Sequence, residues 1–376
     1  MPDFNMVVIG AGGGPNENDL SSYIVKTSSA RWEDGSLCLD AGSGLGALAG
    51  ILTQHPRLFG SDHGHKTDVP ESPQQAAVDV YYSISAFIIS HGHLDHVTSL
   101  VLAAGSQSGP SKRIYALPTT IRVLETVFNG LIWPKLAMHE RGTVPKSFYL
   151  YEPMSPQDGY TQVSPGISAR VMPVTHGICS HSVDRAYESS AWFIRNDKTG
   201  SEFLYFGDVE PDSISNNPRT RQVWRAAAPK IKSGKLHTIF LECSWRSDRP
   251  NAMLFGHLSP PHVLEELRNL ATEIRTYDGK SEPAIQPPPS LFVSILAALG
   301  FGPKAPPPPP PLPDSQLLGS LKDIRLVVTH CKSTPEIFPD GATIADVICD
   351  EIRCLTNAAG LGITIFAAKQ GDAIDI

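Results

Sequence analysis

The sequence predicts an α/β protein in which short strands alternate with helices and carry polar side chains to one edge of the fold. Apolar runs of strand length recur along the 376-residue chain, as at residues 86–90, 238–242 and 324–329. Helical patterns lie between such runs, for example at residues 261–274. Several of the apolar runs are followed by histidine or aspartate. We therefore expect layered sheets and helices with a functional site at the strand ends.

The N-terminal part is expected to begin as a β-meander. Residues 5–9, 23–25 and 37–40 have the composition of strands and are joined by polar segments rich in turn-forming residues. A helix is predicted at residues 45–52, and residues 60–75, rich in Pro, His, Asp and Ser, are expected to form a surface loop.

A glycine-rich turn at residues 10–15 follows the first strand. A dinucleotide-binding fingerprint requires a third glycine in a helix-opening turn, and Pro15 occupies that position. We therefore interpret Gly10-Ala11-Gly12-Gly13-Gly14-Pro15 as a tight turn in which the backbone passes close to a site.

The rest of the chain continues to alternate. The turn residues 197–200 predict a hairpin between strands at 190–196 and 202–207. Pro173 indicates an edge or bulged strand. The other predicted elements are strands at 114–117, 167–175 and 363–368 and helices at 97–104, 119–129 and 341–358.

A proline-rich stretch interrupts this pattern. We expect one catalytic domain over residues 1–376 with an insertion at about 283–315, which contains an unbroken proline run at 306–311. Such a segment adopts polyproline II or stays disordered. It could bind an SH3- or WW-type domain, but we favour a surface insertion without that role.

Composition excludes several classes of function. The net charge of −7 and the scattered basic residues provide no footprint for nucleic acid. Six cysteines without a C-x-x-C pair, and no signal peptide at the N-terminus, favour a reducing, cytoplasmic location. The longest apolar run, residues 291–301, is too short to span a membrane.

The segment His91-Gly92-His93-Leu94-Asp95-His96 is the strongest chemical signal. His91 and His93 are two positions apart, so in an extended or tightly turned backbone they point to the same side. Asp95 and His96 enter the predicted helix and can face a second point. Imidazole and carboxylate ligands suit zinc, manganese or iron, and the spacing allows two neighbouring ions.

Three more ligand-type residues follow predicted strands directly. They are His176 after Val174-Thr175, Asp208 after Phe206-Gly207, and His330 after Val328-Thr329. Together with the motif they provide three His and one Asp for one ion, and one Asp and two His for another if Asp208 bridges. Both sets leave room for a bridging hydroxide, which hydrolysis requires.

The H-x-H-x-D-H motif followed by spaced His, Asp and His resembles the metallo-β-lactamase superfamily. Further details are similar to the class II cyclic-nucleotide phosphodiesterases, the low-affinity cyclic AMP type of fungi and some bacteria. These details are Ser-His-Gly-His-Leu-Asp-His-Val-Thr-Ser-Leu at 90–100, Gly-Gly-Gly-Pro at 12–15, Leu-Asp-Ala-Gly-Ser at 39–43 and Phe-Gly-His-Leu-Ser-Pro at 255–260. The resemblance implies a four-layer αββα sandwich with two mixed β-sheets flanked by helices.

The resemblance also implies a ligand set for two divalent cations. His91, His93 and His176 would hold one ion, Asp95, His96 and His330 the second, and Asp208 would bridge them. Zinc is the default, and Mn²⁺ or Fe²⁺ would also suit these ligands. His257 could replace His330 as a ligand, but we prefer His330 because it ends a strand, whereas His257 lies in a loop.

The implied reaction is hydrolysis of cyclic AMP, and of cyclic GMP as an option, to the 5′-monophosphate by a metal-bridged hydroxide. His257, oriented by Glu242, would protonate the leaving 3′ oxygen, and Asp95 is counted with them among the catalytic residues. The alternatives are a tRNA 3′-processing nuclease, a thioesterase, a lactamase, or a metal-binding interaction protein without catalysis. The nucleotide preference and the oligomeric state stay open, with a homodimer as one option.

Overall fold

Two mixed β-sheets form the centre of the computed structural model, which describes residues 2–60, 72–106, 110–139, 148–179, 186–279 and 310–376. The eight-stranded sheet has the order β15-β1-β2-β3-β4-β5-β7-β6, and the seven-stranded sheet has the order β14-β13-β12-β11-β10-β9-β8. The first sheet comprises β1 (Phe4–Gly13), β2 (Leu20–Thr27), β3 (Ser36–Leu39), β4 (Ile84–Ile88), β5 (Arg113–Ala116), β6 (Ala137–Met138), β7 (Tyr149–Pro153) and β15 (Ala373–Asp375). The second comprises β8 (Thr161–Ser164), β9 (Ile167–Ile178), β10 (Ala186–Asn196), β11 (Glu202–Phe206), β12 (Leu236–Glu242), β13 (Arg325–Thr329) and β14 (Thr364–Ala367).

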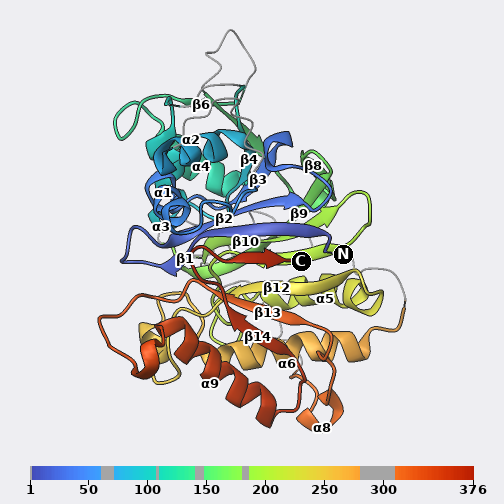
Figure 1. Ribbon diagram of the computed structural model, residues 1–376. Coiled ribbons are helices and arrows are strands. Elements are labelled where there is room, and N and C mark those ends of the chain that lie inside the picture. The colour runs from blue at the N-terminus through green and yellow to red at the C-terminus, as the bar shows by residue number, and fades with distance from the viewer. Residues whose placement is uncertain (1, 61–71, 107–109, 140–147, 180–185, 280–309) are drawn as a thin grey trace.

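Helices cover the outer face of each sheet, as Figure 1 shows. On the first sheet these are α1 (Leu45–Gln54), α2 (Pro73–Ser83), α3 (Leu94–Ala103) and α4 (Pro118–Val127). On the second sheet they are α5 (Thr220–Lys232), α6 (Pro260–Thr276), α8 (Asp314–Leu317) and α9 (Ile344–Ala358). Short 3₁₀ turns complete the described elements: η1 (Trp32–Asp34), η2 (Pro156–Asp158), η3 (Asn251–Met253) and η4 (Pro339–Gly341).

One apolar core lies between each sheet and its outer helices, and a third fills the space between the two sheets. Phe4 of the first sheet and Phe203 of the second pack edge to face, with ring centroids 5.0 Å apart. Tyr23 contacts Tyr205 in the same manner at 5.6 Å. Because such strands are buried on both faces, they appear in the sequence as continuous apolar runs rather than as alternating patterns. This central core fixes the position of one sheet relative to the other, and thereby the strand ends that carry the site.

The predicted four-layer sandwich is confirmed, and most of its elements are where the sequence places them. The hairpin is present as β10 and β11, with Arg195 opposite Glu202. Pro173 of β9 pairs with Ser190 of β10. The pairing of β9 with β8 extends only to Ala169, so at Pro173 β9 has a described partner strand on one side, as in the predicted edge strand.

Several described elements were not predicted: strands β6, β7, β8 and β15, helices α2, α5 and α8, and the short 3₁₀ turns. Helix α2 begins at Pro73, inside the segment expected to be a loop, and has Ser72 as its N-cap. Helix α5 was overlooked because Pro229 lies inside it and its apolar face consists largely of alanine. Strand β15 follows the strand that was expected to be the last, and it pairs with β1.

Much of the proline-rich segment, residues 280–309, lies outside the described residues. Its described C-terminal flank returns to the outer helical layer, since the Leu312 N–H donates a hydrogen bond of 3.0 Å to Thr272 Oγ1 on α6. Within the described ranges, no helix combines the length and apolar character needed to cross a membrane.

Candidate metal centre

The His-rich motif lies where β4 ends and α3 begins. His91 and His93 belong to the loop, and His93 is the N-cap residue of α3. Asp95 and His96 lie in the first turn of the helix. The change from loop to helix turns the two halves of the motif toward different points, as the spacing predicts.

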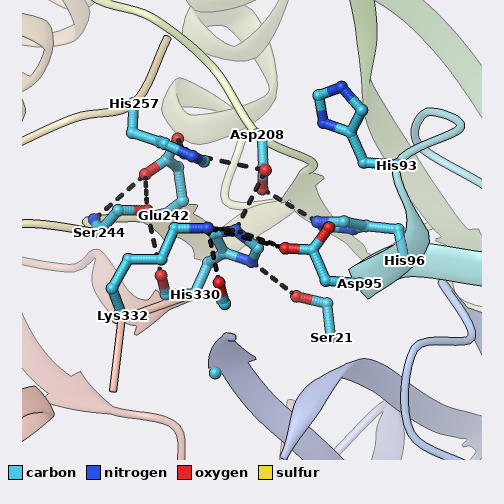
Figure 2. Close-up of polar contacts among 12 residues, drawn as sticks. Ser21, His93, Asp95, His96, Asp208, Glu242, Ser244, His257, His330 and Lys332 are labelled. Atoms are coloured by element: carbon cyan, nitrogen blue, oxygen red, sulfur yellow. Dashed lines mark hydrogen bonds and ion pairs between the residues drawn. The ribbon is translucent and has the colours of Figure 1, made fainter. Parts of the chain in front are cut away.

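The other three predicted ligands come from alternate strands of the second sheet, β9, β11 and β13. His176 lies near the end of β9, Asp208 follows β11 and His330 follows β13. Figure 2 shows Asp208 between the imidazole rings contributed by the two sheets. The structure thus brings all seven residues predicted as ligands into two groups that share Asp208: His91, His93, His176 and Asp208, and Asp95, His96, Asp208 and His330.

In the first group, three imidazole nitrogens converge. His93 Nδ1 lies 3.0 Å from His91 Nε2 and 3.2 Å from His176 Nε2. Asp208 Oδ2 lies 3.7 Å from His91 Nε2 and 3.6 Å from His176 Nε2. Ligand atoms at these separations surround a space of the size that a single cation fills.

The second group lies on the other side of the same carboxylate. Asp208 Oδ1 is 3.2 Å from His96 Nε2, and Asp208 Oδ2 is 3.1 Å from His330 Nε2. Asp95 Oδ2 is 3.6 Å from His330 Nε2. Asp208 is therefore placed so that one carboxylate faces both groups.

In four of these rings Nδ1, the nitrogen that does not face the ligand groups, contacts a partner of its own. His176 Nδ1 lies 2.7 Å from the Gly256 carbonyl oxygen, and His96 Nδ1 lies 2.8 Å from Asp40 Oδ2. His330 Nδ1 lies 3.0 Å from Ser21 Oγ, and His91 Nδ1 lies 3.0 Å from Ser90 Oγ. Partners of this kind orient metal-binding histidines, because they fix the ring and leave Nε2 free to coordinate.

The buried polar atoms of the centre fit a divalent cation. Both carboxylate oxygens of Asp208 and Nε2 of His96 are buried without a hydrogen-bond partner among the described residues. Leaving such groups without a partner is costly, and a cation would satisfy all three atoms. Burial lowers the pKa of His93 and that of His176 to about 4, so these rings are neutral at physiological pH, as metal coordination requires.

Asp208 itself is held as a carboxylate. Burial alone would raise its pKa, but the facing His330 and His96 rings outweigh burial and hold the pKa of Asp208 well below its usual range. An ionised oxygen pair is what a bridging ligand must offer to two cations.

Asp40 is a residue of the site that was not among the predicted site residues. Its Oδ1 accepts a hydrogen bond of 2.7 Å from the Ser90 N–H, and its Oδ2 accepts bonds from Ser90 Oγ at 2.8 Å and from the Tyr205 hydroxyl at 2.6 Å. The same Oδ2 contacts His96. Asp40 therefore fixes both the start of the motif and one of its rings. It follows the apolar strand β3, so the strand-end pattern that identified Asp208 could have identified it as well.

His257 and Glu242 form a buried pair beside the two groups. His257 Nδ1 lies 2.9 Å from Glu242 Oε1 and 3.7 Å from Asp208 Oδ2 (Figure 2). Glu242 also accepts hydrogen bonds from the Val209 N–H and from Ser244. Burial lowers the pKa of His257 to about 4, and burial followed by the Asp208 charge raises the pKa of Glu242 to about 7. The pair can therefore hold one proton near neutral pH.

Close backbone packing positions the His257 loop. Gly256 has a φ of +83°, and a Cβ there would meet the backbone nitrogen of Gly177 at 2.8 Å. Only glycine allows the loop to approach the end of β9 this closely. The contact brings His257 next to His176, with ring centroids 4.8 Å apart.

Comparison with solved structures shows the class of fold. The chain is similar to the metallo-β-lactamase-fold protein YhfI from Bacillus subtilis, with 15% identity, a TM-score of 0.51 and 99% of each chain covered. It is also similar to unliganded yeast PDE1, with 23% identity, a TM-score of 0.75 and 100% of each chain covered. The four layers are therefore those of a metallo-β-lactamase fold.

Sequence comparison shows the family. A family model of the class-II cAMP phosphodiesterases matches residues 60–283. A probable 3′,5′-cyclic-nucleotide phosphodiesterase of Yersinia pestis is 30% identical, over 98% of this chain and 88% of its own. A 3′,5′-cyclic-nucleotide phosphodiesterase of Schizosaccharomyces pombe is 28% identical, over 98% of this chain and 92% of its own. The chain belongs to the class-II cAMP phosphodiesterases.

Proposed function

We propose that this chain hydrolyses 3′,5′-cyclic nucleotides to nucleoside 5′-monophosphates at the two ligand groups that share Asp208. The observation that carries the proposal is the buried Asp208 carboxylate, which lies without a hydrogen-bond partner among the described residues and faces imidazoles of both groups. Membership of the class-II cAMP phosphodiesterases supports the choice of a cyclic phosphodiester as substrate.

His91, His93 and His176 would hold one divalent cation and Asp95, His96 and His330 the second, with Asp208 between them. Zinc suits this set of imidazole and carboxylate ligands best, and Mn²⁺ or Fe²⁺ would also suit it. Two such cations would supply a water that is deprotonated at neutral pH and positive charge for the phosphoryl oxygens. His257 belongs to a third group with His176 and Glu242, and so we assign the second ion to His330 rather than to His257.

In the proposed reaction an oxygen of water forms a bond to phosphorus while the bond from phosphorus to the 3′ oxygen breaks. The leaving 3′ oxygen needs a proton. Glu242 occupies Nδ1 of His257, and Nε2 is then the nitrogen that can give its proton to this oxygen. Glu242 orients the ring, and the proton that the pair holds passes to Nδ1 as Nε2 gives up its own, so that the ring stays neutral.

Assays with four substrates test the proposed function: cyclic AMP, cyclic GMP, bis-p-nitrophenyl phosphate and a pre-tRNA. We expect metal-replete protein to convert the cyclic nucleotides to 5′-monophosphates and to leave the pre-tRNA intact. A relative in Dictyostelium discoideum that is 22% identical is named for both cAMP and cGMP, so both nucleotides belong in the assay. Failure of metal-replete protein to turn over either nucleotide would contradict the proposal.

Gly13 provides a test of the second ion. A Cβ at this position would meet Cδ2 and Nε2 of His330 at 2.6 and 2.7 Å, so Gly13→Ala should displace the ring that holds that ion. We expect about 10- to 100-fold weaker binding of one cation, as when the support of a ligand is removed. Titration with Zn²⁺ measures it. Gly46→Ala is the control, because a Cβ at Gly46 meets nothing within 4 Å. Equal affinity in wild type and Gly13→Ala would argue against His330 as a ligand.

We further propose that residues 1–376 act as one catalytic domain. The shared core between the sheets supports this arrangement. A homodimer and an SH3- or WW-type partner for the proline-rich segment stay predictions from the sequence.

A further inference from the structure

A lysine that was not among the predicted site residues lies at the second ligand group. Lys332 Nζ is 3.3 Å from His330 Nε2 and 3.7 Å from Asp95 Oδ2. Its side chain is 20% exposed, so the ammonium lies at the border between the centre and solvent. Figure 2 shows the chain of Lys332 extending past His330 toward Asp95.

The backbone around Lys332 is held on two sides. The Lys332 N–H donates to the Ser244 carbonyl at 3.1 Å, and the Ser333 N–H donates to the Gly14 carbonyl at 2.9 Å. Lys332 Nζ donates to the Gly13 carbonyl oxygen at 2.6 Å. Ser244 and the glycine-rich turn therefore hold the backbone at Lys332, and the turn also holds the ammonium beside the centre.

The charge of Lys332 lacks a strong partner once a cation is bound to the second group. Asp95 and His330 would then direct their ligand atoms to the cation, and two positive charges would repel each other across a few ångströms. The contact to the Gly13 carbonyl would keep the ammonium close by. An anion that lies against the cation is the partner that this arrangement lacks.

We propose that Lys332 binds a non-bridging phosphate oxygen of the cyclic nucleotide and so helps to set affinity for the substrate. The inference rests on the proposed function, because it takes the cyclic phosphodiester as the ligand. A chain with a net charge of −7 attracts an anion only through local positive charge. Lys332 provides such a charge beside the proposed second ion.

The test compares Lys332→Met and Lys332→Arg with wild type. A charge-assisted hydrogen bond to phosphate corresponds to about a 10- to 100-fold effect on affinity. We expect Lys332→Met to raise KM for cyclic AMP by that factor with a smaller change in kcat, and Lys332→Arg to stay within several-fold of wild type. Lys369→Met is the matched control, since Lys369 pairs with Asp346 at 2.8 Å outside the ligand groups.

Two further measurements separate substrate binding from a role in building the centre. Cation content per chain should be unchanged in Lys332→Met. Calorimetry should show weaker binding of 5′-AMP to this variant and unchanged binding of adenosine, which lacks phosphate. Equal 5′-AMP affinity and equal KM in wild type and Lys332→Met would overturn the inference, as would loss of cations from both variants. If wild type itself fails to hydrolyse cyclic nucleotides, the proposed function fails, whatever the 5′-AMP measurements show.

Discussion

Asp208→Ala should lose both cations and nearly all activity in a single step. The carboxylate oxygens of Asp208 lie 3.1 to 3.7 Å from imidazole nitrogens of both groups, so one substitution removes a ligand from each proposed ion. We expect kcat/KM for cyclic AMP to fall by at least about 10³-fold, since the proposed nucleophile and the charge stabilisation both depend on the ions. Elemental analysis and initial rates on the same sample measure the two losses.

A control must show that Asp208→Ala still folds. Asp197→Ala, in the turn between β10 and β11, should keep the cations and the activity. Circular dichroism should show the same secondary structure for both variants. Retention of two cations per chain by Asp208→Ala would rule out the bridging role.

His257→Ala should have the opposite signature, with both cations retained and kcat lowered. Loss of a general acid typically costs about 10²- to 10⁴-fold. The loss should depend on the leaving group, because p-nitrophenolate departs without a proton whereas a ribose 3′ oxygen does not. We therefore expect a large fall in kcat for cyclic AMP and a small one for bis-p-nitrophenyl phosphate.

His237→Ala provides the matched control for His257→Ala. His237 lies on β12, the same strand as Glu242, but it is exposed and lies 2.9 Å from the Gly234 carbonyl oxygen. This variant should behave as wild type with both substrates. If His257→Ala loses a cation instead, His257 is a ligand and the assignment of His330 must be revised. Equal losses on the two substrates would exclude the role of proton donor.

The sequence predicted site residues where a ligand-type side chain stands at the end of a strand that local patterns predict. The motif at residues 91–96 contains four ligand-type side chains in six residues. His176 lies near the end of a strand that could be predicted, and Asp208 and His330 directly follow such strands. Strand ends along one edge of a layered fold converge, and so these residues could be grouped from their positions in the sequence alone.

The missed residues depend on pairing between distant segments. Asp40 reaches Ser90 because β3 lies parallel to β4, with Leu39 opposite Ile88. Ser21 reaches His330 across 309 positions in sequence. Lys332 approaches Asp95 because its segment is held against the glycine-rich turn. The strand-end position of Asp40 is visible in the sequence but its partner Ser90 is not, and the contacts of Ser21 and Lys332 arise only when the sheets pack.

The parts of the centre become available at different times as the chain is synthesised. His91, His93, Asp95 and His96 belong to the first hundred residues, whereas His330 follows β13, and the Ser21–His330 contact can form only after β13 has been made. A nascent chain that ends before β13 would have a first ligand group but no complete second one. Occupancy of the second group would then report that β13 has taken its place in the second sheet, before α9, β14 and β15 complete the fold.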